Sequence, residues 1–205
     1  MTHKEEVCIR TAKKFLASTV KAVKNIKLDP SSFAAAVEAI AGCRHKNKIV
    51  TTGMGKAGHI ARKVASSLSS LTFSACYLHP GEAAHGDVGV IRSGDVLLAF
   101  STSGKTREVL ETIEFSKKLG ISKVISITSH SDGPIRNLSD IILDMGPIIE
   151  AGHLSMAPTT SIVVMLVIAD MLALTAAEEM EVSRFEYGLR HHGGYLGQKC
   201  RGEVK

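Results

Sequence analysis

The sequence predicts an α/β fold, a three-layer α-β-α sandwich with a five-stranded parallel sheet. Five short runs rich in Val, Ile and Leu alternate with stretches that have helical periodicity. The strand runs are largely apolar, which is typical of strands covered by helices on both faces. With 205 residues, 44% hydrophobic and 22% charged, the chain has an ordinary globular composition. No internal repeat or linker interrupts it, so we expect a single domain over residues 1–205.

Two helices are expected to open the chain, within residues 1–45. Apolar residues recur at helical spacing over 4–27, with lysines between them, which predicts an amphipathic helix. The segment from Asp29 to Ser32 breaks this helix and offers caps for a second helix over 33–41. Gly42 then ends the second helix.

The α/β core is expected over residues 48–180. Its predicted strands are 48–52, 73–78, 95–100, 123–128 and 140–143. Its predicted helices are 56–71, 106–119 and 158–180, with a glycine-rich loop over 79–89 and a short turn or helix from Asp132. Residues 181–205 are expected to form a C-terminal active-site segment and a solvated basic tail.

The predicted helix over 158–180 is the most apolar part of the chain. Asp170 interrupts its run of apolar side chains, whereas a membrane span usually needs about 20 apolar residues without a central charge. We therefore expect a buried helix, in the core or between subunits, and no membrane partner. The cysteines form no CxxC pair and the N-terminus lacks the apolar core of a signal peptide, which predicts a cytoplasmic protein with reduced thiols.

The charge balance favours a small anionic partner. The formal net charge is +5, which fits a sugar phosphate at least as well as a polyanion. Aromatic residues make up only 4% of the chain and do not interleave with Lys and Arg. Stacking platforms for single-stranded nucleic acid are therefore not expected, and we predict no nucleic-acid partner.

Three strand ends in this sequence are rich in Gly, Ser and His. They are the segments 53–56, 79–87 and 101–106. Ligands of parallel α/β sheets bind at the carboxyl ends of the strands, so these three loops are expected to converge on one site.

The segment 101–106, STSGKT, is here named the hydroxyl loop, and it is the clearest candidate anion site. It follows a buried strand and opens a helix, where free backbone N–H groups and a positive dipole end favour a phosphate. The alternative is an ordinary helix cap, but a cap needs only one hydroxyl. A nucleotide P-loop is disfavoured because Ala99 stands where that motif requires Gly.

A second glycine pattern follows the first strand. Gly53, Gly55 and Gly58 match GxGxxG, which taken alone would suggest a dinucleotide. The acidic residue that this fingerprint needs at the end of the next strand is replaced by His79. Lys56 instead places a cation at the predicted pocket, and no redox cofactor is expected.

Histidines and carboxylates crowd the first two loops, but no zinc pattern fits them. The residues concerned are His59, His79, Glu82, His85 and Asp87. We do not expect an essential metal. We expect these residues to form hydrogen bonds with the loop backbone and with a polyol. An inhibitory metal site at His79 and His85 stays open as an alternative.

Two carboxylates and a histidine pair complete the candidates. Glu108 lies in a first helical turn, where complementing the helix dipole is the alternative role. Glu150 follows two isoleucines, and partial burial is expected to raise its pKa toward the range of a general base, the alternative being a solvated loop carboxylate. His191 and His192 precede two glycines near the C-terminus, where a flexible turn is the alternative.

Together these residues resemble the sugar isomerase (SIS) domain of D-arabinose 5-phosphate isomerases. The resemblance runs from about Lys48 to Lys199 and rests on five segments. They are GMGKAGH at 53–59, HPGEAAHGDVG at 79–89, STSG at 101–104, APTTS at 157–161 and HHGGYLG at 191–197. It implies a flavodoxin/Rossmann-like fold and interconversion of D-ribulose 5-phosphate and D-arabinose 5-phosphate through a cis-enediol. It further implies supply of Kdo for lipopolysaccharide or capsule, and a homotetramer with active sites between subunits.

Carried over residue by residue, the family's functional positions fall on Lys56, Glu108, Glu150 and His191. Its phosphate-binding positions fall on Ser101, Thr102, Ser103 and Thr106, and further substrate contacts are expected at Gly55, His85 and His192. Glu150 is the favoured base, with Glu108 second. His191, from a neighbouring subunit, is expected to move protons on oxygen and assist ring opening, and Lys56 to stabilise the enediolate.

The sequence departs from the family pattern at three places. Lys105 stands where Glu is frequent, Gly152-His153 where Cys-Pro is frequent, and His192 where Pro is usual. Many members of the family carry paired CBS regulatory modules, and we expect this chain to be a short form without them. Isomerisation of another phosphosugar, such as a hexulose or heptulose phosphate, and a non-catalytic sugar-phosphate sensor remain the alternative functions.

Overall fold

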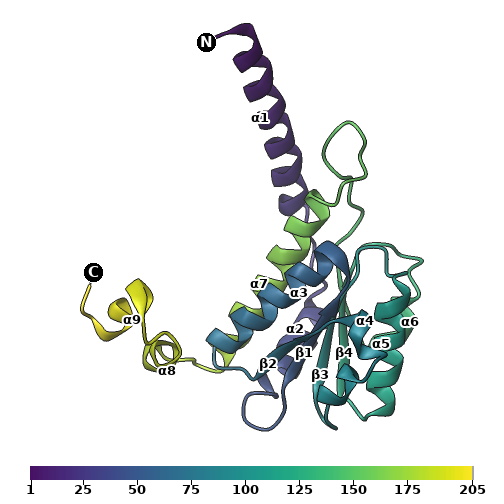
Figure 1. Ribbon diagram of the computed structural model, residues 1–205, viewed down its shortest axis with the longest axis vertical. Coiled ribbons are helices and arrows are strands. Elements are labelled where there is room, and N and C mark those ends of the chain that lie inside the picture. The colour runs from purple at the N-terminus through teal and green to yellow at the C-terminus, as the bar shows by residue number, and fades with distance from the viewer. Residues whose placement is uncertain (205) are drawn as a thin grey trace.

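The computed structural model describes residues 1–204 and confirms the predicted fold class. Five parallel strands form one sheet in the order β2-β1-β3-β4-β5 (Figure 1). They are β1 (Ile49–Gly53), β2 (Ala75–Leu78), β3 (Val96–Phe100), β4 (Lys123–Thr128) and β5 (Ile141–Asp144). β1 and β3 are buried along their whole length, as expected for central strands with helices on both faces.

The strand order puts a switch point between β1 and β3. From β1 the chain moves outward to β2 and then returns across β1 to β3, so the connections leave these two neighbouring strands toward opposite faces. The register pairs Gly53 with Phe100, so both strands end at the same level. Loops that follow them therefore start side by side, at the position where parallel α/β sheets bind ligands.

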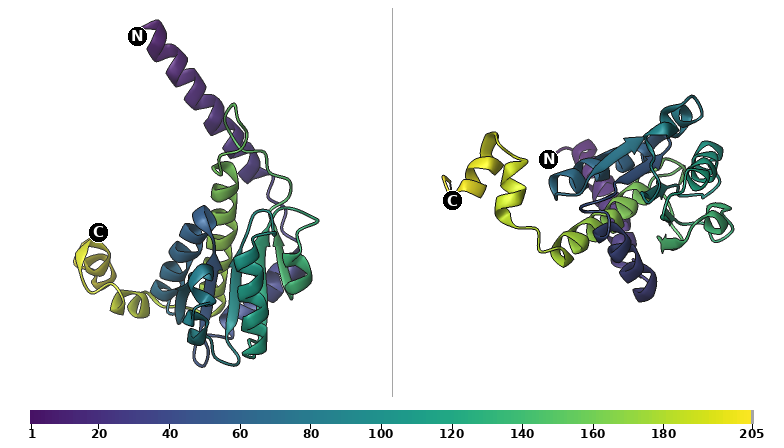
Figure 2. Two further views of the ribbon diagram at one scale, coloured as in Figure 1. Left: turned by 45° about the vertical axis from the view of Figure 1, so that its right-hand side comes forward. Right: turned by 90° about the horizontal axis from the view of Figure 1, so that it is seen from below.

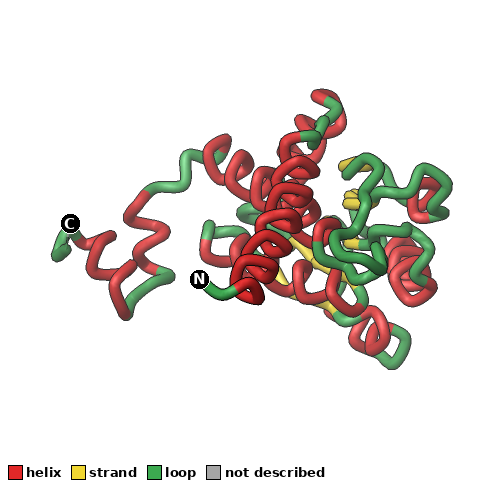
Figure 3. Tube along the Cα trace, turned by 90° about the horizontal axis from the view of Figure 1, so that it is seen from above, coloured by secondary structure: helices red, strands yellow, loops and turns green. Residues whose placement is uncertain are grey.

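Helices cover both faces of the sheet, and each face has its own apolar core. On one face lie α2 (Pro30–Ala41), α3 (Gly55–Ser70) and α7 (Thr160–Glu179), which pack on side chains such as Leu98 and Phe100. On the other lie α4 (Pro80–Ala83), the 3₁₀ helix η1 (Asp87–Val90), α5 (Arg107–Lys118) and α6 (Ile135–Leu138), around Leu97 and Ala99. Figure 3 shows the strands between these helices. The alternation along β3 is the period of two that sends successive side chains to opposite faces.

α7 is long and apolar enough to cross a membrane by length and composition, yet it is a packed helix here. It makes contacts with α2 and α3, and 56% of its apolar window is buried. Its charge at Asp170 is paired with Lys63 of α3 at 2.5 Å. The predicted burial of this helix in the core is confirmed, and its bounds differ from the expected 158–180 by at most two residues.

Helices at the two ends of the chain project away from the sandwich (Figures 1 and 2). They are α1 (His3–Lys24), and α8 (Arg184–Leu189) followed by α9 (Gly194–Arg201). α1 has no buried residue, although it carries apolar side chains such as Phe15 and Leu16. The sequence analysis predicted no helix after residue 180, whereas the structure has α8, which starts at a capping box of Ser183 and Glu186, and α9.

Candidate active site at the carboxyl ends of β1 and β3

A pocket of about 360 Å³ opens at the switch point, and is here named the sheet-edge pocket. Its lining includes six residues that the sequence singles out: Lys56, Ser101, Thr102, Ser103, Thr106 and Glu150. It also includes Pro158 and Ser161 of the segment APTTS, which received no site role in the sequence analysis, and His130, Met156 and Ile162, which the sequence analysis missed. The loops that meet here follow β1, β3 and β4 and precede α7. The expected contribution of the loop after β2 was wrong for this pocket, because none of residues 79–89 lines it.

The hydroxyl loop is ordered by hydrogen bonds among its own members. The Ser101 and Thr106 hydroxyls lie 3.1 Å apart, and the Gly104 N–H donates to Ser101 Oγ at 3.1 Å. The Lys105 N–H donates to Ser103 Oγ at 3.2 Å. Thr106 is the N-cap residue of α5, but its side chain makes no capping hydrogen bond. The first N–H groups of α5 are therefore left for a ligand, and the alternative of an ordinary cap does not describe this loop.

Gly104 explains why this loop can be so tight. Its φ is +66°, a conformation that residues with a Cβ rarely adopt. A Cβ there would also lie 2.6 Å from Ile135 Cγ2 and 3.1 Å from Gly133 Cα. A side chain at position 104 would thus push the hydroxyl loop away from the segment after β4.

The turn after β1 is shaped by close packing of α3 against the strand. A Cβ on Gly58 would lie 2.4 Å from the Gly53 carbonyl oxygen, and Tyr77 Oη donates to that same oxygen at 2.9 Å. The third glycine of the GxGxxG pattern therefore serves helix packing. Lys56, in the first turn of α3, is exposed and lines the sheet-edge pocket beside an N-terminus that has no side-chain cap. Its charge adds to the positive end of the helix dipole.

Glu150 is held by the start of α7. Its Oε2 accepts hydrogen bonds from Thr159 N–H at 2.9 Å, Ser161 N–H at 3.2 Å and the Thr159 hydroxyl at 3.4 Å. Burial raises the pKa of this carboxyl, but the Ser161 hydroxyl and the backbone N–H groups of residues 159–161 together outweigh it. The pKa of Glu150 therefore lies below its ordinary value, and the expectation of a raised pKa was wrong.

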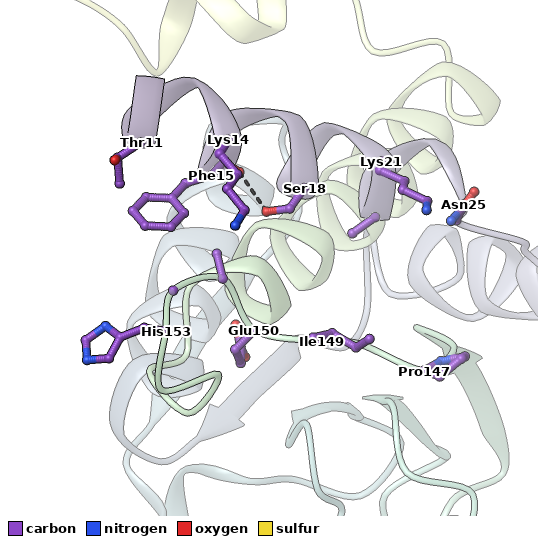
Figure 4. Close-up of a pocket in the computed structure, with 13 residues that line it drawn as sticks. Thr11, Lys14, Phe15, Ser18, Lys21, Asn25, Pro147, Ile149, Glu150 and His153 are labelled. Atoms are coloured by element: carbon purple, nitrogen blue, oxygen red, sulfur yellow. Dashed lines mark hydrogen bonds between the residues drawn. The ribbon is translucent and has the colours of Figure 1, made fainter. Parts of the chain in front are cut away.

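A second pocket, of about 630 Å³, lies between α1 and residues 147–153 and is here named the α1 pocket. Figure 4 shows α1 above this loop, with Lys14 and Phe15 on the side that faces it. Glu150 lines both pockets, but no residue of the hydroxyl loop lines the α1 pocket. The α1 pocket also has cations, Lys14 and Lys21, beside Glu150. The sheet-edge pocket differs from it by holding the hydroxyl loop at the uncapped start of α5.

Comparison with known proteins agrees with this geometry. Residues 43–175 match the model of the SIS domain family, which is more than half of the chain. This chain belongs to the SIS family. The resemblance drawn from its motifs is thereby confirmed.

Relatives of this SIS domain include sugar-phosphate isomerases. Arabinose 5-phosphate isomerase KdsD of Pseudomonas aeruginosa is 38% identical over 154 residues, which are 75% of this chain and 47% of that protein. The chain thus spans about half the length of the curated relatives it matches. A Bacteroides fragilis structure described as a phosphosugar isomerase involved in capsule formation is 41% identical (TM-score 0.87, covering 92% of this chain and 99% of that one). An E. coli CFT073 protein in complex with arabinose 5-phosphate is 33% identical (TM-score 0.84, covering 93% and 100%).

Other predicted site residues of the SIS domain lie outside the sheet-edge pocket. Glu108 is exposed in the first turn of α5, and His85 is exposed between α4 and η1. Gly55 lies in the turn after β1, with a φ of +59°, but is not among the lining residues. Their roles stay predictions.

His191 and His192 follow α8, at the end of the chain that projects from the sandwich (Figure 1). The His191 ring stacks on Tyr187 at 4.1 Å, and its Nδ1 lies 2.9 Å from the Tyr187 carbonyl oxygen. Within one chain these histidines are not brought to the sheet-edge pocket. A role for them there requires a second subunit, as the sequence analysis expected, and stays a prediction.

The histidines near β2 do not form a cluster with other metal ligands. Within residues 1–204, no three His, Cys, Asp or Glu side chains are close enough together to hold a metal ion. His79 Nδ1 is buried without a hydrogen-bond partner in the described chain, and its ring packs against Gly81 and Tyr77. An inhibitory site at His79 and His85 stays a prediction.

Proposed function

We propose that this chain is an aldose–ketose phosphosugar isomerase that interconverts D-ribulose 5-phosphate and D-arabinose 5-phosphate. The observation that carries the proposal is the sheet-edge pocket, where the hydroxyl loop, Lys56 and Glu150 share one cavity of about 360 Å³. The KdsD relatives and the relative in complex with arabinose 5-phosphate support this substrate class. The product would enter synthesis of Kdo for lipopolysaccharide or capsule.

In this proposal the phosphate binds at the hydroxyl loop and the start of α5. Hydroxyls and N–H groups bind the anion there without placing a buried charge beside it. Glu150, which lines the same pocket, removes a proton from C2 of the aldose and returns it to C1. The oxygen proton moves the same way along the sugar, from O2 to O1, through a cis-enediolate that Lys56 stabilises by its charge. Because hydrogen moves as a proton, the reaction needs no redox cofactor.

The lowered pKa of Glu150 fits a base that is ionised before substrate arrives. At neutral pH the carboxylate is charged, and the N–H groups at the start of α7 fix its orientation. The same hydrogen bonds make it a weaker base than a carboxylate with a raised pKa. The proposal therefore assigns its contribution to position as much as to basicity.

We further propose a cytoplasmic homotetramer in which residues 1–205 form one SIS domain per subunit. His191, with His192 beside it, would reach the sheet-edge pocket of a neighbouring subunit. Support comes from exposed apolar side chains on the projecting helices, including Leu16 of α1 and Phe185 of α8, which is 72% exposed. Large apolar side chains exposed together on one chain are typical of surfaces that a partner covers.

Proton NMR of the purified protein with D-ribulose 5-phosphate, with and without EDTA, tests this function. We expect D-arabinose 5-phosphate to appear at the same rate in both samples, because the proposed chemistry uses only side chains. Binding without conversion would support the sensor alternative. Conversion of a hexulose or heptulose phosphate alone would reassign the substrate.

A further inference from the structure

The segment that follows β4, residues 129–134, contributes His130 to the lining of the sheet-edge pocket and is here named the β4 loop. It is hydrogen-bonded to the hydroxyl loop: the carbonyl oxygen of Thr102 accepts from Ser129 N–H at 3.0 Å and from His130 N–H at 3.3 Å. Just beyond it, the Ile135 N–H donates to the Gly104 carbonyl oxygen at 3.1 Å. Two points along the hydroxyl loop are thus fixed to this segment.

Close packing holds the same two segments together. Gly133 is buried, and a Cβ there would lie 2.7 Å from the Ser103 carbonyl oxygen and 3.0 Å from Gly104 Cα. Contacts this short leave no room for a side chain between the loops. The β4 loop therefore has a defined position relative to any anion that the hydroxyl loop binds.

His130 is the side chain that this arrangement presents to the pocket. Its carbonyl oxygen accepts from Arg136 Nε at 2.8 Å, and Arg136 in turn pairs with Asp144 at 2.6 Å. The backbone of His130 is thus held from two sides. Its ring is exposed, lines the sheet-edge pocket and makes no hydrogen bond within the described residues.

Few charged side chains near the hydroxyl loop are available to bind an anion there. Lys105 lies in the loop, but its ammonium pairs with Asp132 at 2.7 Å and is not part of the pocket lining. Among the described lining residues Lys56 supplies the one Lys or Arg charge, and it comes from the turn after β1. On the β4 side of the hydroxyl loop, His130 is the described residue that lines the pocket, and its ring lies near the Asp132 carboxylate, whose pKa it helps to lower.

We propose that His130 is a substrate-binding residue that donates a hydrogen bond to the phosphate group held by the hydroxyl loop. This rests on the proposed function for the identity of the substrate, but the contact itself concerns the phosphate. The hydrogen bond of the His130 backbone N–H to the Thr102 carbonyl oxygen places this residue beside the hydroxyl loop. It acts on binding and leaves the chemical step unchanged.

Binding of inorganic phosphate, measured by ³¹P NMR or calorimetry, tests the contact directly. We expect His130→Ala to weaken phosphate binding about tenfold, since a hydrogen bond to a charged group is lost. His130→Gln keeps an N–H donor and should recover part of that loss. The matched control is His45→Ala, because His45 is also exposed but precedes β1 at the opposite edge of the sheet.

Two further variants distinguish the effect of the His130 ring from the effect of the position of the β4 loop. Asp132→Asn breaks the Lys105 pair, whose side chains are 50% and 70% exposed, and removes a negative charge near His130, so it should not weaken phosphate binding. Gly133→Ala pushes the β4 loop from the hydroxyl loop and should weaken phosphate binding as well.

Steady-state kinetics of His130→Ala distinguish a role in substrate binding from a merely structural role of His130. His130→Ala should raise KM about tenfold with kcat within about threefold of wild type. Unchanged phosphate affinity in a folded His130→Ala protein overturns the proposal, and so does a loss confined to kcat. A wild-type protein that binds phosphate through His130 but isomerises no sugar would instead overturn the proposed function and leave this contact standing.

Discussion

Glu150 combines two roles that its neighbours in the chain do not reveal. It accepts hydrogen bonds from Thr159 and Ser161 at the start of α7, so it caps a helix that begins about ten residues further on. It also lines the sheet-edge pocket as its carboxylate. Substitutions there must be chosen so that loss of the cap is distinguished from loss of the base.

Glu150→Gln removes the charge and keeps an oxygen that can accept from the same N–H groups. We expect kcat to fall by about 100-fold or more with KM nearly unchanged, and stability to fall because the folded state favours the charged carboxylate. Glu150→Ala should lose the cap in addition, at about 1 kcal/mol in the free energy of unfolding. Steady-state kinetics and urea denaturation of both variants check this. Near-normal turnover of a folded Glu150→Gln protein would remove Glu150 from the proposed role.

The lowered pKa of Glu150 also predicts where activity is lost in acid. A carboxyl whose folded pKa lies below its ordinary value of 4.5 stays ionised above that value and gains its proton only at lower pH. Its share of stability is likewise present above pH 4.5 and is lost as the pH falls through the folded pKa.

We therefore expect any acid limb of kcat/KM that belongs to Glu150 to lie below pH 4.5. The profile is measured where circular dichroism shows that the protein remains folded. An acid limb well above this value that disappears in Glu150→Gln would show that the pKa is raised after all.

At the scale of elements, the hydroxyl loop should act on binding and the turn after β1 on stability. Ser103 lies in the loop, accepts from the Lys105 N–H and lines the pocket. Ser103→Ala should raise KM about five- to tenfold with kcat largely kept, because one donor to the anion is removed. Initial-rate kinetics measure this, and an unchanged KM would count against phosphate contact at this position.

Gly58 tests the packing of α3 on β1. Its Cβ would meet the Gly53 carbonyl oxygen at 2.4 Å, so Gly58→Ala should destabilise the protein by about 1–3 kcal/mol. Gly89→Ala is the matched control, because nothing lies within 4 Å of a Cβ at that position. Urea denaturation compares the two. Equal stability of both variants would mean that α3 can shift away from the strand without cost.

The order and type of the core elements could be predicted from the sequence, because strands and helices there are buried and keep their characteristic periods. The predicted strand over 123–128 is β4 with the same bounds. The predicted loop over 79–89 contains α4 and η1, which are too short to show a period. The capping box of Ser183 and Glu186 indicates the start of α8, but α8 has no buried face and therefore no apolar period that would predict it.

The part of the candidate site that directly follows central strands could be predicted from the topology of the sheet. Residues 56 and 101–106 follow central strands, and the rule for carboxyl strand ends placed them together. The same rule applied to β4 would have found His130. Pro158, Ser161 and Ile162 could not be found in this way, because the long segment 145–159 separates β5 from α7 and they do not directly follow a strand. The sign of the Glu150 pKa shift was missed because the N–H groups that lower this pKa come from residues 159–161, about ten residues further along the chain.

At the scale of the whole molecule, the separation of His191 from the sheet-edge pocket leads to a test of assembly. If His191 acts in a neighbour's pocket, a pair of chains that carry Glu150→Gln and His191→Ala has one intact site. Co-expression of these two variants should then restore about a quarter of wild-type activity, because random pairing makes half of the pairs mixed. No activity above that of either variant alone would contradict a shared site.

The central claim is that the sheet-edge pocket holds a phosphosugar with Glu150 beside the carbons that exchange a proton. Proton NMR of D-ribulose 5-phosphate in D₂O tests it most directly. We predict that wild-type protein forms D-arabinose 5-phosphate with deuterium at C2, and that Glu150→Gln suppresses both product and label by about 100-fold. Formation of labelled product at the wild-type rate by Glu150→Gln would contradict the claim.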